Sequence, residues 1–159
     1  MDRPHVALPL HGGCFCGAVR YRLDGAPLLV HVCHCHDCQT RSGSVYALIV
    51  LVRTADLSVS GPLRTARRTT GRGAVVDDNA CPTCDVRLLA SAVAAPEYTS
   101  LRGGTFDDAS WAVPIAQTWT ESAIPWAILP GVRQVDPNTL DYYALGEAWR
   151  ATAPVFTAA

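Results

Sequence analysis

The sequence contains no lysine, and charged residues make up only 17% of the chain. All 13 basic residues are arginines, scattered from Arg3 to Arg150 rather than gathered into a run, and the net charge is -1. Binding to nucleic-acid phosphates requires a clustered basic face. The one local concentration, "RTARRTT" at residues 64–70, alternates with threonines, which is typical of the solvated side of a strand. We therefore expect no nucleic-acid partner.

Long hydrophobic runs are also missing. The longest, "VYALIVLV" at residues 45–52, is far short of the roughly 20 residues that span a bilayer, so it predicts a buried strand and no membrane segment. The opening "MDRPHVALPLHGG" lacks the apolar build-up and the small-residue cleavage site of a secretory signal, which indicates a cytoplasmic protein. We expect this opening segment to be mobile and assign no role to its His5 and His11.

The 159 residues, 49% of them hydrophobic, are typical of one globular domain, 1–159. Residues 18–23, "AVRYRL", alternate apolar and polar side chains with period two, which predicts a half-buried strand in an antiparallel or mixed sheet. Three further segments predict strands: residues 56–61, 86–93 and 98–104. Only residues 141–151 carry apolar side chains at helical spacing, although Gly146 weakens that helix. We predict a mainly β fold of short, coiled sheets with little helix.

The seven cysteines carry the main functional signal. An odd number cannot be fully paired within one chain, and a reducing compartment disfavours disulfides, so we interpret the cysteines as metal ligands. They fall into three groups: Cys14 and Cys16 in "CFC", Cys33, Cys35 and Cys38 in "CHCHDC", and Cys81 and Cys84 in "CPTC". Structural zinc is closed by four protein ligands, whereas catalytic zinc keeps three and leaves one position open. A division into four and three therefore predicts two zinc ions, one of each kind.

The two outer pairs are candidates for the four-ligand site. "CPTC" has the spacing of a metal knuckle, in which a tight turn directs both sulfurs at one ion. In an extended segment Cys14 and Cys16 point to the same side, so a strand edge would present both sulfurs to that ion. The alternative is that these four residues are buried free cysteines that pack as small hydrophobic side chains.

The middle group is local in sequence. Its first two cysteines share one face of an extended segment, and a turn through His36 would bring the third sulfur round to meet them. His34 lies between the first two and is expected to point away. The alternative is a second structural zinc, closed as a Cys3His site by His31 or His36.

Five stretches resemble a known family in content and in order: "GGCFCGAVRY" (12–21), "CHCHDCQTRSGS" (33–44), "CPTCDVRL" (81–88), "RGGTFDD" (102–108) and "TWTESAIPW" (118–126). With these motifs the chain resembles, over about residues 12–129, the glutathione-dependent formaldehyde-activating enzymes, which are grouped with the centromere protein V relatives. One departure is Asp85, which stands where the family's knuckle usually has glycine. Aspartate tolerates the left-handed conformation better than most residues, so we expect the turn to persist.

The resemblance implies an Mss4-like fold of coiled β-sheets around a structural zinc, followed by a C-terminal extension with a short helix. It implies condensation of glutathione with formaldehyde to S-(hydroxymethyl)glutathione, which is formally a carbon-sulfur lyase reaction read in reverse. Carried over by motif, the structural zinc ligands are Cys14, Cys16, Cys81 and Cys84, and the catalytic zinc ligands are Cys33, Cys35 and Cys38.

The choice of ligands has its own chemical meaning. Three thiolates give a zinc ion a net charge of -1, which makes it a weaker Lewis acid than a zinc held by imidazoles. Such a centre suits capture of a fourth sulfur as thiolate, for attack on an aldehyde carbon, better than it suits making hydroxide.

Two hypotheses for the function follow. The first is an enzyme that makes or breaks a carbon-sulfur bond on a small thiol such as glutathione. The second is a zinc-stabilised binding module without turnover, which a closed second site would favour. Arg41 is either a carboxylate partner for the substrate or part of an ordinary polar turn. Trp119 and Trp126 either wall a pocket or belong to the core. The oligomeric state stays open.

Overall fold

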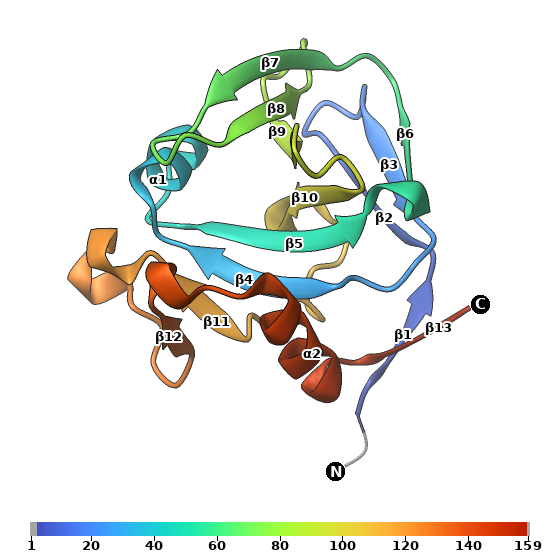
Figure 1. Ribbon diagram of the computed structural model, residues 1–159. Coiled ribbons are helices and arrows are strands. Elements are labelled where there is room, and N and C mark those ends of the chain that lie inside the picture. The colour runs from blue at the N-terminus through green and yellow to red at the C-terminus, as the bar shows by residue number, and fades with distance from the viewer. Residues whose placement is uncertain (1–2, 159) are drawn as a thin grey trace.

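β-strands dominate the structure, a computed structural model that describes residues 3–158 (Figure 1). The predicted mainly β architecture is confirmed. The strands are β1 (His5–Leu8), β2 (Leu10–Gly13), β3 (Arg20–Leu23), β4 (Leu29–Cys33), β5 (Ala47–Arg53), β6 (Leu57–Ser60), β7 (Arg64–Thr69), β8 (Val75–Ala80), β9 (Arg87–Ala92), β10 (Tyr98–Arg102), β11 (Ala116–Thr118), β12 (Arg133–Val135) and β13 (Val155–Ala158). The α-helices are α1 (His36–Ser42) and α2 (Tyr142–Thr152).

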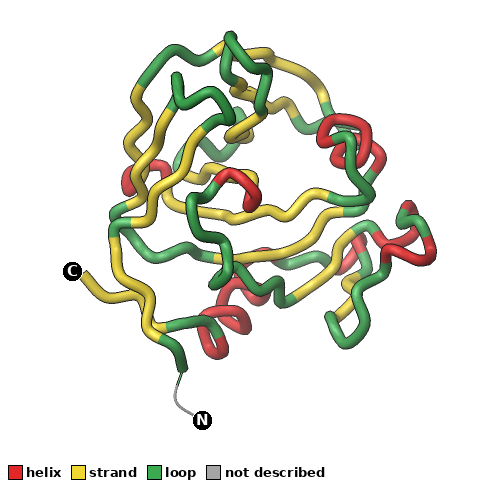
Figure 2. Tube along the Cα trace, turned by 180° about the vertical axis from the view of Figure 1, so that it is seen from behind, coloured by secondary structure: helices red, strands yellow, loops and turns green. Residues whose placement is uncertain are grey.

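Eight strands form one curved sheet in the order β12, β11, β4, β5, β10, β9, β8, β7, which rises as an arc from bottom to top in Figure 1. This sheet is mixed, because β11 runs parallel to β4 and β12 while the remaining neighbours are antiparallel. β2, β3 and β6 form a three-stranded antiparallel sheet. β1 and β13 pair in parallel, so the first and last strands of the described chain lie side by side, as Figure 2 shows from behind.

The period-two alternation in "AVRYRL" produces the strand that it predicts, β3. Val19, Tyr21 and Leu23 are at most 2% exposed and join the hydrophobic core. Arg20 and Arg22 project to the solvent side. A strand with one buried and one solvated face must keep its register, because a slip by one residue would place both arginines in the core.

The other strand predictions are also confirmed. The apolar run at 45–52 falls in β5, where Val50 and Val52 are fully buried. The three further predicted segments form β6, β9 and β10. The arginine and threonine segment at 64–70 forms β7, whose residues are exposed except for the partly buried Arg68. The arginines of this strand therefore belong to the sheet and do not form a separate basic element.

Helix α2 confirms the predicted C-terminal helix. It begins after Asp141, whose side chain accepts hydrogen bonds from two backbone N–H groups of the first turn, at 2.9 and 3.1 Å. Leu145 and Trp149 are the buried apolar residues of its inner face. Gly146, which weakens the helix by propensity, lies on the same face. A Cβ there would lie 3.2 Å from the carbonyl oxygen of Leu28, so glycine allows close packing of the helix against that backbone.

Two expectations about local structure are wrong. The opening segment is not mobile, because it forms β1 and β2, and His5 and His11 belong to these strands. The chain also has a second helix, α1, where we predicted only a turn after the cysteines. Within residues 3–158 no helix combines the length and the apolar character needed to cross a membrane.

Candidate functional site

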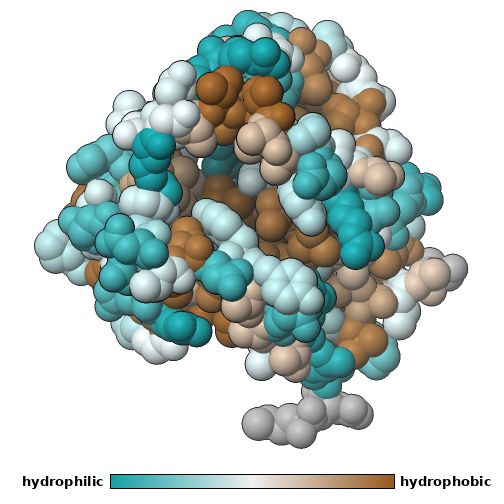
Figure 3. All heavy atoms as spheres, in the orientation of Figure 1, coloured by the Kyte–Doolittle hydropathy of each residue, from teal (hydrophilic) through white to brown (hydrophobic). Residues whose placement is uncertain are grey.

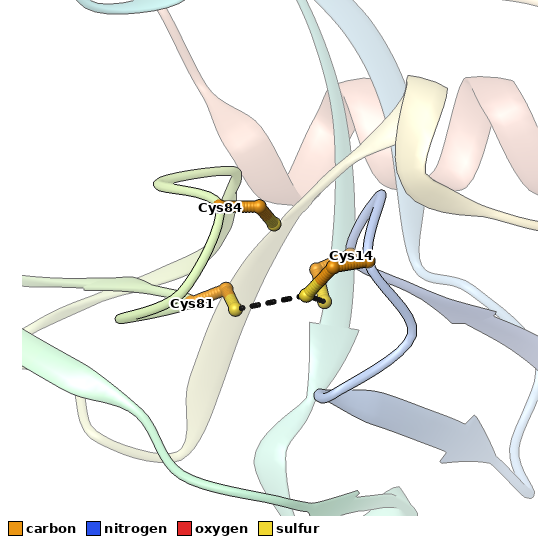
Figure 4. A group of neighbouring side chains, drawn as sticks. Cys14, Cys81 and Cys84 are labelled. Carbon is orange, nitrogen blue, oxygen red and sulfur yellow. Dashed lines mark hydrogen bonds between the residues drawn. The ribbon is translucent and has the colours of Figure 1, made fainter.

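Four cysteine side chains meet between two loops that are far apart in the sequence. Cys14 and Cys16 follow β2, and Cys81 and Cys84 follow β8. The sulfurs of Cys14 and Cys16 are 3.5 Å apart, and those of Cys16 and Cys81 are 3.7 Å apart. Figure 4 shows the labelled side chains directed toward one another from the two loops. The structure thus brings together the four residues that the sequence analysis assigned to one site.

Both loops have the same backbone pattern. The N–H of Cys14 donates to the carbonyl of Val19, and the N–H of Cys81 donates to the carbonyl of Val86, each at 3.0 Å. The N–H of Val19 also donates to the sulfur of Cys14, at 3.2 Å. The expectation of a strand edge for the first pair is wrong, because β2 ends at Gly13 and both cysteines lie in a turn. Cys14 and Cys16 therefore form a second knuckle, which faces the knuckle of Cys81 and Cys84.

Each knuckle needs one residue in the left-handed region directly after its second cysteine. Gly17 fills this position in one loop with φ of 79°, and Asp85 fills it in the other with φ of 58°. The prediction that the turn persists with aspartate is confirmed. The side chain of Asp85 also pairs with Arg64 on β7, at the surface. The turn is thus held by local geometry and by one exposed ion pair.

The middle group of cysteines lies where β4 passes into α1. Cys33 ends the strand, Cys35 is the N-cap of the helix and Cys38 lies in its first turn. The sulfurs of Cys33 and Cys35 are 3.4 Å apart, and the N–H of Cys38 points at the sulfur of Cys35, also at 3.4 Å. A helix is present where a turn was predicted, but it brings the sulfur of Cys38 to the other two sulfurs, as the turn was expected to do.

Both groups have the dimensions of a metal site. Within each group the sulfur atoms all lie within 4.8 Å of one another. Four sulfurs at about 2.3 Å from a zinc ion would be about 3.8 Å apart in tetrahedral geometry, and the observed separations of 3.4 to 3.7 Å are close to this. Among residues 3–158, no histidine, aspartate or glutamate joins the group of three. The first group thus offers four ligands and the second offers three.

The family model described as glutathione-dependent formaldehyde-activating enzyme matches residues 9–122. The chain belongs to this family. A solved structure of a Rhodobacter sphaeroides protein is similar, with a TM-score of 0.48 and 22% sequence identity, over 61% of this chain and 87% of that one. No curated protein matches the chain.

The histidines of this family member lie around the second group without joining it. His34 points away, as predicted, and is fully buried, where its Nε2 lies 3.1 Å from the side-chain oxygen of Gln117. That oxygen already accepts the N–H of Leu129, and an amide oxygen only accepts, so Nε2 of His34 carries the proton. His36 is exposed, and His31 is buried with its ring edge against Tyr142. Burial lowers the pKa of His31 to about 4.

Three side chains that the sequence analysis did not assign surround the second group. Trp119, with φ of 59°, packs against the sulfurs, and the guanidinium of Arg72 lies over its ring. Burial and, to a smaller extent, the charge of the nearby cysteines raise the pKa of Tyr142 to about 12. Sequence spacing gave a hint of Trp119 only, since Arg72 comes from a hairpin turn and Tyr142 from α2. Trp126 lies elsewhere and is 77% exposed, so neither the pocket nor the core interpretation fits it.

The three thiols of the second group differ in acidity because they share protons. Hydrogen bonds from Cys33 and Cys38 lower the pKa of Cys35, against the opposing effect of burial. The pKa of Cys33 is raised, first because its proton is held by Cys35 and then by Cys38 and by burial. Ionisation therefore begins at Cys35, which also receives the backbone N–H at the start of α1.

Arg41 takes part in a shared ion pair. It pairs with the buried Asp78 on β8, at 3.1 Å. Arg68, Arg87 and Arg102 pair with the same carboxylate. This shared ion pair differs from an ordinary polar turn, and the role of Arg41 as a carboxylate partner for the substrate stays a prediction.

Proposed function

We propose that the protein is a zinc-dependent carbon-sulfur lyase of the formaldehyde-activating type, acting on the adduct of glutathione and formaldehyde. The observation that carries the proposal is the three-thiol group of Cys33, Cys35 and Cys38, which has no fourth ligand among residues 3–158. Family membership supports the same reaction. We assign the open group to the catalytic zinc. We assign the group of four, which contains Cys14, to the structural zinc.

The proposed reaction adds a thiol across a carbonyl group. The sulfur loses its proton and forms a bond to the aldehyde carbon, the carbon-oxygen double bond becomes single, and the oxygen takes up a proton. A zinc ion held by three thiolates would supply an open position that keeps the incoming sulfur in its thiolate form. The reverse reaction releases formaldehyde and the thiol.

The protein's own residues prepare this position. The backbone N–H at the sulfur of Cys35 and the nearby guanidinium of Arg72 place positive charge beside the ligands, which favours their thiolate form. The hydroxyl of Tyr142 is protonated at neutral pH, as in any tyrosine whose pKa is not lowered, so it can donate a hydrogen bond beside the site. Trp119 packs against the apolar cluster that contains Cys33.

The direct test is the exchange rate between free glutathione and its hydroxymethyl adduct, measured by NMR with carbon-13 formaldehyde. We expect the zinc-loaded protein to raise this rate and Cys35→Ser to abolish the effect. His36→Ala is the matched control within the same motif, and it should retain the full rate because this side chain is exposed.

X-ray absorption of the zinc-loaded protein distinguishes the alternative. Added glutathione should raise the sulfur coordination at the second site to four. A nitrogen ligand there that millimolar glutathione does not displace, together with an unchanged exchange rate, would contradict the enzyme and favour a binding module.

A further inference from the structure

A pocket lies between α1 and the strands β7, β8 and β9 of the eight-stranded sheet. Its volume is about 250 Å³. Figure 3 shows this face hollowed between α1, the β7 and β8 hairpin and β5, with both hydrophilic and hydrophobic side chains around the hollow. Its lining residues come from α1, β7, β8, β9 and the Cys81–Cys84 knuckle: Arg41, Arg64, Ala66, Asp78, Ala80, Asp85 and Arg87. Five of these seven residues are charged, so the pocket is built for a charged ligand.

The charges in and beneath this pocket do not balance. Five arginines meet three aspartates there, so these side chains carry a net charge of +2 although each arginine shares a carboxylate. The arginines of the cluster are Arg41, Arg64, Arg68, Arg87 and Arg102, and the aspartates are Asp37, Asp78 and Asp85.

Three of these arginines also keep unused hydrogen-bond donors. The Nε atoms of Arg41, Arg87 and Arg102 are buried and find no acceptor within residues 3–158. Their side chains are 31%, 16% and 14% exposed. Holding several guanidinium groups together at partial burial is unfavourable unless an anion shares their charge. Asp78 alone cannot do so, since its two oxygens already serve four arginines.

The cluster lies within reach of the second cysteine group. Arg41 follows Cys38 by three residues on α1, a rise of about 4.5 Å. Arg102 bridges the two regions, because its charge interacts with Cys33 and Cys38 while its guanidinium lies 3.8 Å from Asp78. An extended tripeptide spans about 10 Å, so a thiol at the cysteines and a carboxylate at the arginines fit within one glutathione-sized molecule.

We propose that this arginine pocket binds a carboxylate of the thiol substrate and thereby selects peptide-like thiols that bear carboxylates. The inference rests on the proposed function, because it places the thiol of the same molecule at the second cysteine group. Guanidinium groups suit this task, since two parallel N–H groups match the two oxygens of a carboxylate.

The test separates the pocket from the metal site by using S-methylglutathione, whose sulfur is blocked but whose carboxylates are intact. We expect calorimetry on the zinc-loaded protein to detect its binding and to show about tenfold weaker binding for Arg41→Gln. Asp78 keeps Arg68 and Arg87 in this variant, so the fold should persist. Arg64→Gln changes an exposed lining residue and provides a second variant with the same expected loss. Equal affinity of both folded variants and the wild type, or no binding at all, would overturn the proposal.

Arg53→Gln is the matched control, because Arg53 is exposed at the end of β5 and has no ion pair among the described residues. It should bind S-methylglutathione as the wild type does. A parallel titration of the cobalt-substituted protein with glutathione and with 2-mercaptoethanol follows the thiol itself. If glutathione leaves the cobalt spectrum unchanged while S-methylglutathione still binds in an Arg41-dependent way, the proposed function fails and the carboxylate pocket stands. If both thiols enter with equal affinity and Arg41→Gln has no effect, the pocket fails and the proposed function stands.

Discussion

Asp78 is a buried acidic side chain, only 4% exposed, that holds the arginine cluster together. Burial alone would raise its pKa, but hydrogen bonds from Arg87 and Arg68 outweigh burial and lower it. A carboxylate whose pKa is lower in the folded than in the unfolded chain stabilises the fold above the unfolded value, about pH 4. This contribution is lost as the pH falls through the lower folded value.

We therefore expect Asp78→Asn to destabilise the protein by about 3 to 5 kcal/mol at neutral pH, because buried arginines lose their counter-charge. The wild type should lose this advantage over the variant as the pH falls below about 4. Chemical denaturation of both proteins at several pH values measures it. Asp77→Asn is the control on the opposite face of β8, where the pair with Arg67 is exposed, and its effect should be much smaller. Equal losses from the two variants would contradict a special role for Asp78.

The two knuckles show how a local element tolerates a departure from its usual sequence. At Asp85 the backbone has φ of 58°, a conformation that glycine adopts without cost and that β-branched residues strongly disfavour. We expect Asp85→Val to lower the free energy of unfolding by about 1 to 2 kcal/mol relative to Asp85→Gly. Thermal denaturation of the zinc-loaded proteins measures the difference. Thr83→Val, in the same turn but outside the left-handed region, should have little effect, and comparable damage there would show that the turn tolerates no valine at all.

Sequence patterns could predict the elements whose cause is local. The spacing of the cysteines predicted both ligand groups, and the alternation at residues 18–23 predicted β3. Helix α1 could not be predicted in this way, because it has no buried residue and therefore no apolar stripe. It is defined instead by the cap at Cys35 and by Gly43, whose φ of 63° ends it. The arginine pocket could not be predicted, because the tertiary fold brings Arg41 from α1 and Arg87 from β9 to one carboxylate.

The two cysteine groups occupy different places in the whole molecule. The group of four joins the loop after β2 to the loop after β8, between residues 65 positions apart, and so connects the small sheet to the far end of the large one. The group of three is assembled within one short segment at the end of β4. Zinc binding at the first site would therefore be coupled to long-range folding, whereas binding at the second would only organise a helix start.

This difference predicts unequal effects of the same substitution. Cys84→Ser is preferable to Cys81→Ser, because Cys81 is fully buried and a serine there would destabilise by desolvation alone. Cys84 and Cys35 are both partly exposed, so they form a matched pair. We expect about two zinc ions per wild-type chain by elemental analysis, and about one in a folded Cys35→Ser protein with a nearly unchanged melting temperature. Cys84→Ser should melt far lower or aggregate, because its zinc supplies part of the folding free energy. Equal melting temperatures of the two variants, or a wild type that holds a single zinc ion, would contradict the division into a structural and an open site.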